Sequence, residues 1–128
     1  LAFKPNTDDV RDAPSLVVVP MLQQAGANIK AYDPEAREQA EKHFQNVDWK
    51  DNAYDVADNA DALVILTEWN EFRALSLREI KEKMTQPLLL DFRNIYTEAE
   101  IREKGFRYIS IGRQEINADS AAALKAAV

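Results

Sequence analysis

The sequence predicts an α/β fold, a three-layer arrangement in which helices cover both faces of a mostly parallel sheet. Four short apolar runs have the length of strands, at residues 29–32, 62–67, 88–92 and 108–111. The middle two are almost continuously apolar, which is typical of strands buried on both faces of a parallel sheet. Segments with helical spacing of apolar residues separate the runs, and this alternation favours the doubly wound class.

The first helix is expected over residues 14–25. Apolar side chains recur there at helical spacing, and Gly26 provides a stop signal. Asp12 stands where a residue that caps the helix start would lie. A run of three valines would also fit a strand, and Pro20 removes an interior hydrogen bond, so we expect a kinked helix.

Four further helices are expected, at residues 34–44, around 52–57, at 75–84 and at 97–104. In the last one Thr97 and Glu100 have the spacing of a capping box, and Gly105 follows as a stop signal.

The chain opens on three apolar residues that run directly into a charged loop, as at the end of a strand. We therefore expect a strand ahead of residue 1, which would make the first strand of a five-stranded parallel sheet a truncated one. We also expect that the chain is part of a larger protein. Within it, residues 1–128 would form a single domain that ends in an alanine-rich tail helix within 114–128.

Charge and composition exclude several functions. A net charge of −6 argues against a nucleic-acid-binding protein, which would normally present a basic face. The sequence has no cysteine, so it holds no disulfide, thiolate metal site or cysteine nucleophile. Its one histidine, His43, lies in a polar helical stretch, so we expect a solvated side chain and no metal site. No apolar run approaches the ~20 residues that span a bilayer, and we expect a cytoplasmic protein without membrane contact.

Candidate binding residues follow from the fold. Ligands of open α/β sheets collect at the carboxyl ends of the strands. The sequence has only three glycines and no glycine-rich phosphate loop, so side chains must meet any phosphate. Lys4 and Arg93 follow strand ends and are the candidates; the alternative for each is a surface ion pair with a nearby aspartate. For Arg11 an ion pair is favoured, because carboxylates flank it on both sides.

Other residues near the strand ends favour structural roles. Trp69 and Phe72 could stack on a ring, but aromatic side chains after a strand more often close the core. Asp33 could hold a ribose, yet without a glycine motif it more simply caps the following helix. Composition and spacing alone therefore predict an anion-binding α/β domain.

Several sequence blocks narrow this further. The segment from Phe3 to Pro14, FKPNTDDVRDAP, closely resembles the start of the C-terminal domain of UDP-glucose 6-dehydrogenases, in the UDP-glucose/GDP-mannose dehydrogenase family. The likeness continues through YDP at 32–34, ADALVILTEWNEF at 60–72 and DFRNIY at 91–96. These blocks have the family's order and spacing, cover about residues 1–113 and leave the tail outside.

The resemblance implies a Rossmann-like domain that grips a nucleotide sugar. Enzymes of this family oxidise UDP-glucose to UDP-glucuronate with two NAD and one water, through a thioester on a cysteine that lies before this domain. NAD would be bound mainly by a separate N-terminal domain, and the full-length enzyme would be a homodimer or a larger homo-oligomer. This chain would then bind the substrate and carry no catalytic residue.

By motif position, the resemblance implies that Phe3 and Lys4 contact the UDP-sugar and that Arg93 binds its UDP portion. It also implies that Arg11 reaches the NAD. Phe92 departs from the family, where many members have glycine, and could reshape the loop that presents Arg93. Two alternatives stay open: a sister dehydrogenase of GDP-mannose or a UDP-N-acetylhexosamine, and a nucleotide-binding module without catalysis.

Overall fold

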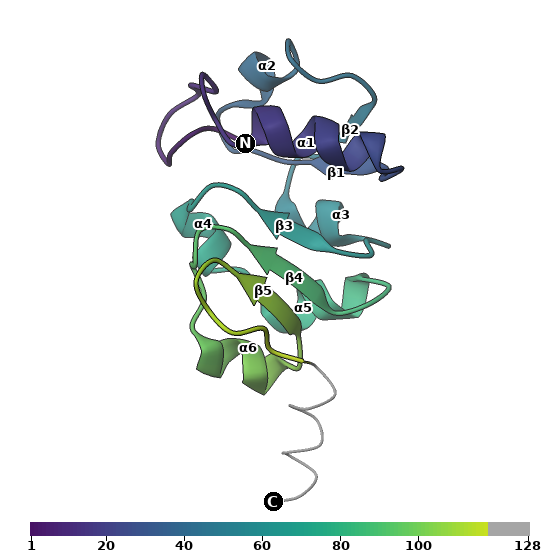
Figure 1. Ribbon diagram of the computed structural model, residues 1–128, viewed down its shortest axis with the longest axis vertical. Coiled ribbons are helices and arrows are strands. Elements are labelled where there is room, and N and C mark those ends of the chain that lie inside the picture. Colours follow the sequence, from purple (N-terminus) through teal and green to yellow (C-terminus); the bar gives the residue numbers. More distant parts are fainter. Residues whose placement is uncertain (118–128) are drawn as a thin grey trace, which may run out of the picture.

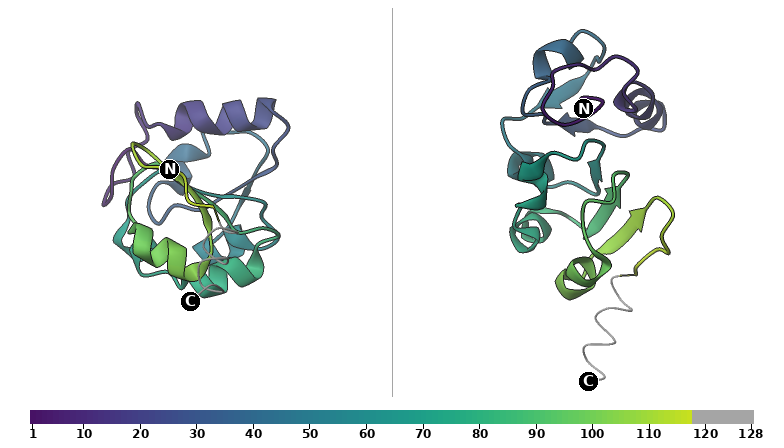
Figure 2. Two further views of the ribbon diagram at one scale, coloured as in Figure 1. Left: turned by 60° about the horizontal axis from the view of Figure 1, so that its bottom comes forward. Right: turned by 90° about the vertical axis from the view of Figure 1, so that its left-hand side faces the viewer.

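Helices and strands alternate along the chain in the computed structural model, which describes residues 1–117 (Figure 1). In chain order the elements are α1 (Ser15–Gln24), β1 (Ile29–Ala31), α2 (Arg37–Ala40), β2 (Val47–Trp49), α3 (Ala53–Ala57), β3 (Leu63–Ile65), α4 (Asn70–Arg73), α5 (Leu77–Lys83), β4 (Leu88–Asp91), α6 (Glu98–Lys104) and β5 (Arg107–Ser110). Seen from a second direction, α1 lies on one side of the strands and α5 and α6 on the other (Figure 2). The predicted α/β class is confirmed.

All pairings between named strands are parallel. β1 pairs with β2, and β4 lies between β3 and β5. The four predicted strands are present, and within the described residues the strands form two hydrogen-bonded groups. The predicted five-stranded sheet includes the strand expected ahead of residue 1, so its continuity stays a prediction. Strand β2 was not predicted. It has only three residues, of which the middle one is exposed, so it lacks the apolar run by which the other strands were found.

The predicted helices differ in how closely the structure matches them. α1 was predicted, but its cap was not: Pro14 occupies the N-cap without a side-chain hydrogen bond, and Asp12 lies ahead of it with a left-handed φ of 55°. α6 has the predicted capping box, in which the hydroxyl of Thr97 accepts from the Glu100 N–H. Gly105 ends that helix with a φ of 76°, a conformation that glycine adopts without a steric cost.

In place of the helix predicted over residues 34–44, the structure has the short helix α2. Helix α4 was not predicted. Only four residues form α2, and turns surround it. A carboxylate oxygen of Asp33 accepts from the N–H groups of Glu35 and Ala36, so it stabilises the turn that leads into α2. The buried side chains of Ala36, Ala40 and Phe44 then anchor the segment in a small core with α1.

Two apolar clusters form the core. The larger lies around β3, β4 and β5 with α5 and α6, and includes the fully buried Leu89, Ile101 and Phe106. The smaller joins α1 and α2 to the first residues of the chain, Ala2 and Val10 among them. The predicted tail helix falls almost wholly on residues 118–128, outside the described residues; before them, Ile116 forms an antiparallel bridge to Tyr108.

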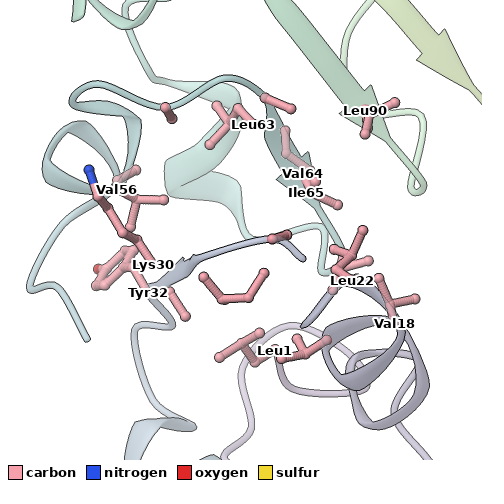
Figure 3. Close-up of a pocket in the computed structure, with 18 of the residues that line it drawn as sticks. Leu1, Val18, Leu22, Lys30, Tyr32, Val56, Leu63, Val64, Ile65 and Leu90 are labelled. Carbon is pink, nitrogen blue, oxygen red and sulfur yellow. The ribbon is translucent and has the colours of Figure 1, made fainter. Parts of the chain in front are cut away.

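A cavity of about 490 Å³ lies between β1 and β3, which are not hydrogen-bonded to each other (Figure 3). Side chains of α1, including Val18 and Leu22, line it together with residues of both strands and Leu90. Leu1 lies at the end where both strands finish, since its amino group contacts Asp33 after β1 and Thr67 after β3. The strand expected ahead of residue 1 stays a prediction.

Candidate functional site

The first residues of the chain lie against the carboxyl ends of three strands. Asp33 follows β1, Thr67 follows β3, and Arg93 follows β4. The Ala2 N–H donates to the Asp33 carboxylate over 2.9 Å, and the Thr67 hydroxyl donates to the Ala2 carbonyl over 2.6 Å. The opening segment is thereby fixed at the edge where α/β proteins bind ligands.

The loop between Phe3 and Asp9 closes on itself and on Arg93. The Phe3 N–H donates to the Asp9 carbonyl over 3.1 Å, and the Arg93 Nη2 donates to the Phe3 carbonyl over 3.0 Å. Residues that are 90 positions apart in the sequence are therefore in direct contact. The structure brings together three of the four predicted site residues, because Lys4 follows Phe3 in this loop.

Arg93 is held from several sides. Its Nε donates to the Leu66 carbonyl over 2.8 Å and lies 3.3 Å from a carboxylate oxygen of Glu68. That oxygen is buried and has no hydrogen-bond partner of its own in the part of the chain that the structure describes. The Arg93 side chain is 27% exposed, so the guanidinium is reachable from solvent yet fixed in direction. The expected ion-pair alternative has an acidic partner, but it is Glu68 rather than an aspartate.

The backbone around Arg93 rests on Asp91. This residue is fully buried, and its carboxylate accepts from the backbone N–H groups of Arg93, Ile95 and Tyr96. The hydroxyl of Tyr108 on β5 donates to the same carboxylate over 2.5 Å. A buried carboxylate with four donors is electrostatically satisfied, so it holds the loop after β4 in one conformation.

Lys4 is an exposed cation beside an aromatic ring. Its Nζ lies 5.4 Å from the centroid of the half-buried Phe3 ring, which is within the range of a cation–π contact. Lys4 forms no ion pair within residues 1–117, so the alternative of a surface ion pair finds no partner there. The ammonium is therefore available to an anion that reaches this loop.

Arg11 forms the ion pair that its neighbours in the sequence predict. Its Nε and Nη2 donate to the two carboxylate oxygens of Asp9, with the shortest contact at 2.6 Å. These hydrogen bonds lower the pKa of Asp9 to about 2. The Arg11 side chain is 87% exposed, so it lies on the same loop as Phe3 but outside the cluster around Arg93.

Asp33 is a buried carboxylate that holds the opening segment. One of its oxygens accepts from the Ala2 N–H over 2.9 Å and lies 2.6 Å from the Leu1 nitrogen, and the other accepts from the N–H groups of Glu35 and Ala36. These backbone donors satisfy the buried carboxylate and tie the start of the chain to the turn after β1.

The residues that hold the site were not predicted as site residues. Thr67 and Asp91 each stand at or just after the end of an apolar run, and both are almost completely buried. A polar residue at the carboxyl end of a buried strand is the sequence signal that could have found them. Trp69, Phe72 and His43 behave as predicted, since the first two are buried in the core and His43 is exposed.

Within residues 1–117 no group of three or more His, Cys, Asp and Glu side chains could hold a metal ion. No helix of that range is long and apolar enough to cross a membrane.

The comparisons with known proteins agree on one family. Residues 1–98 match the model of the UDP-glucose/GDP-mannose dehydrogenase family, UDP binding domain. The chain belongs to this family. This UDP binding domain is 54% identical over 115 residues to a UDP-glucose 6-dehydrogenase of Rhizobium meliloti, and 43% identical over 117 residues to the UDP-glucose 6-dehydrogenase TuaD of Bacillus subtilis. It covers 26% and 25% of those two proteins, so it spans about a quarter of their length, while 90% and 91% of the domain is matched.

Solved structures support the same assignment. The UDP binding domain superposes with a TM-score of 0.75 and 31% identity on an NDP-N-acetyl-D-galactosaminuronic acid dehydrogenase from Methanosarcina mazei, covering 88% of the domain and 23% of that chain. A UDP-D-ManNAc dehydrogenase from Pyrococcus horikoshii matches with a TM-score of 0.63 and 27% identity, covering 88% and 24%. The predicted Rossmann-like class and the predicted family are thus confirmed.

Proposed function

We propose that this domain grips the UDP portion of UDP-glucose in a UDP-glucose 6-dehydrogenase that oxidises the sugar to UDP-glucuronate with two NAD. The observation that carries the proposal is the hydrogen bond from Arg93 to the Phe3 carbonyl, which joins the two predicted binding segments at the ligand-binding edge of the sheet. The curated relatives with this name support the choice of substrate.

The chemistry of the cluster suits a diphosphate. A guanidinium has five N–H donors, and Arg93 commits its Nε and one from Nη2 to the carbonyls of Leu66 and Phe3. These two bonds fix the plane of the group, and the donors that remain can meet phosphate oxygens. The exposed ammonium of Lys4 supplies a second, movable charge, and the Phe3 ring beside it offers an apolar surface to the sugar nucleotide.

We assign NAD contact within this chain to Arg11 alone. Its exposed guanidinium suits a phosphate of the cofactor, although it would have to leave or share Asp9 to bind one. The hydride acceptor is the nicotinamide of NAD, and this chain contributes no catalytic residue to the transfer. The single domain over residues 1–128, the homo-oligomer and the cytoplasmic location expected from the sequence stay predictions.

A sister activity is the second candidate. The solved neighbours are named as dehydrogenases of N-acetylated sugars, so the alternative substrate is a UDP-N-acetylhexosamine. GDP-mannose is a third, given the family's description. A nucleotide-binding module without catalysis would bind UDP but turn over none of these sugars.

Binding of UDP to the full-length protein tests the site. Arg93→Ala and Lys4→Ala should each weaken UDP affinity in calorimetry, because the loss of a charged hydrogen-bonding partner costs about 1.5–3 kcal/mol. The matched control is Arg78→Ala on α5, where the arginine is exposed and paired only with Glu82 among the described carboxylates. Unchanged affinity in both site variants would refute the assignment.

Turnover tests the substrate. The full-length protein should form two NADH for each UDP-glucose consumed, measured by absorbance at substrate exhaustion. NADH formation with a UDP-N-acetylhexosamine or GDP-mannose, and none with UDP-glucose, would move the proposal to the sister activity.

A further inference from the structure

Asp91 is a buried carboxylate that faces the backbone rather than solvent. It is the last residue of β4 and is fully buried. One carboxylate oxygen accepts from the Arg93 N–H over 3.1 Å, and the other accepts from the Ile95 N–H over 2.8 Å and the Tyr96 N–H over 3.3 Å. Burying a carboxylate costs free energy, and hydrogen-bond donors to both of its oxygens offset that cost.

Tyr108 supplies the fourth donor from the neighbouring strand. β5 runs parallel to β4 with Tyr108 opposite Leu89, and the fully buried hydroxyl reaches the Asp91 carboxylate over 2.5 Å. Burial first, and then the hydrogen bond to Asp91 and its charge, raise the pKa of Tyr108. The hydroxyl therefore stays protonated and remains a donor to Asp91 throughout the physiological range.

The hydrogen bonds to Asp91 fix the backbone position from which the Arg93 side chain extends. Three backbone N–H groups of the loop after β4 donate to one carboxylate, and Asn94 within this loop adopts a left-handed φ of 53°. From this fixed backbone the guanidinium reaches the carbonyls of Leu66 and Phe3. A shift of the loop would take both contacts away and turn the remaining donors from the ligand.

We propose that Asp91 and Tyr108 are positioning residues for nucleotide binding, which act by holding the loop that presents Arg93. This inference rests on the proposed function, since it takes Arg93 to be a UDP ligand. Neither residue touches the nucleotide. Their effect on UDP binding passes through the Arg93 backbone. Lys4 and Phe3 differ from them, because these residues lie on the opening loop whose carbonyl Arg93 contacts.

A double-mutant cycle with UDP as the probe tests the proposal in the full-length protein. Tyr108→Phe removes one hydroxyl and keeps the ring, so the variant is expected to fold. It should weaken UDP affinity about fivefold. This is less than the roughly tenfold or larger effect of losing a hydrogen bond to a charged group, because three backbone donors still hold Asp91. In an Arg93→Ala background the same change should have no further effect, because the residue through which it acts is gone. Tyr54→Phe is the matched control, since its hydroxyl accepts from the Ser76 N–H beside α5.

Asp91→Asn is the stronger perturbation. An amide nitrogen would face N–H donors in place of an acceptor, so UDP affinity should fall more than in Tyr108→Phe. If this variant does not fold, Tyr108→Phe alone still decides the question.

The outcomes distinguish the positioning role of Asp91 and Tyr108 from the role of Arg93 as a UDP ligand. A loss of affinity in Tyr108→Phe that disappears in the Arg93→Ala background supports the positioning role. Wild-type affinity in Tyr108→Phe, or an equal loss with and without Arg93, overturns that role and leaves Arg93 as a ligand if Arg93→Ala itself weakens binding. No loss in Arg93→Ala overturns the proposed site and the positioning role with it.

Discussion

Thr67→Val is the substitution whose effect follows most directly from the geometry. Thr67 is 1% exposed, and its hydroxyl donates to the Ala2 carbonyl over 2.6 Å while accepting from the Leu1 amino group over 3.1 Å. Valine has the same shape but no hydroxyl, so the packing stays and a buried carbonyl loses its donor. Leaving such a group unsatisfied costs about 1–3 kcal/mol, so the free energy of unfolding should fall by that amount.

Urea denaturation followed by far-UV circular dichroism measures the change. Thr85→Val serves as the control, because the exposed Thr85 hydroxyl makes its hydrogen bonds where water can replace it. The control should change the free energy of unfolding by less than about 0.5 kcal/mol, as is usual for surface substitutions. UDP affinity should also fall in Thr67→Val, since the opening segment carries Phe3 and Lys4. Equal stability of the two variants would refute the claim that Thr67 anchors this segment.

Three further predictions concern charge, pairing and the cavity. The Asp9 carboxyl should titrate near pH 2 in an NMR experiment. Because the folded-state pKa is lowered, the ion pair with Arg11 stabilises the fold at a pH above the ordinary pKa of 3.8, and this contribution is lost as the pH falls through about 2. Titration near pH 3.8 would contradict the ion pair. Arg11→Ala should raise the pKa of Asp9 to its ordinary range and leave UDP affinity unchanged while weakening NAD binding, and a loss of UDP affinity instead would contradict its assignment to the cofactor. Backbone amides of β1 and β3 that face the cavity should exchange rapidly with deuterium in the chain of 128 residues, because no strand pairs with them there. In a longer protein that contains the expected preceding strand, the same amides should exchange slowly. Equal exchange in both proteins would contradict that strand.

The sequence predicted those structural features that depend on residues close together in one short segment. The apolar runs around Leu63 and Leu89 are long enough to mark buried strands, and Thr97 with Glu100 marks a helix start through contacts three residues apart. The pair of Arg11 and Asp9 is equally local. Such features depend on backbone geometry that neighbouring residues determine, so they can be predicted without the fold.

Features that depend on distant contacts could not be predicted in the same way. The short strand β2 is defined by its pairing with β1 and not by its own composition. Asp12 has the residue type of a helix cap, but its left-handed backbone places it ahead of the helix start, where Pro14 stands instead. The Arg93 contact with the Phe3 carbonyl spans most of the chain, so no spacing rule could reveal it.

Their place after strand ends predicted Lys4 and Arg93 as anion-binding residues, and the family resemblance added Phe3. The fold joins their segments, and their contact with UDP stays a prediction. The residues beneath them, Thr67 and Asp91, required the three-dimensional structure. This division has a physical cause. A ligand-contacting residue is often part of a recognisable motif, whereas a buried residue that holds it is recognised by its partners in space.

The binding role of Arg93 and Lys4 can be seen directly in a crystal structure of the full-length protein with UDP bound. We expect diphosphate oxygens within hydrogen-bond distance of Arg93 and beside Lys4, at the carboxyl ends of β3 and β4, with the Arg93 bond to the Phe3 carbonyl retained. UDP bound elsewhere, with both side chains free of it, would show that this site does not bind the nucleotide.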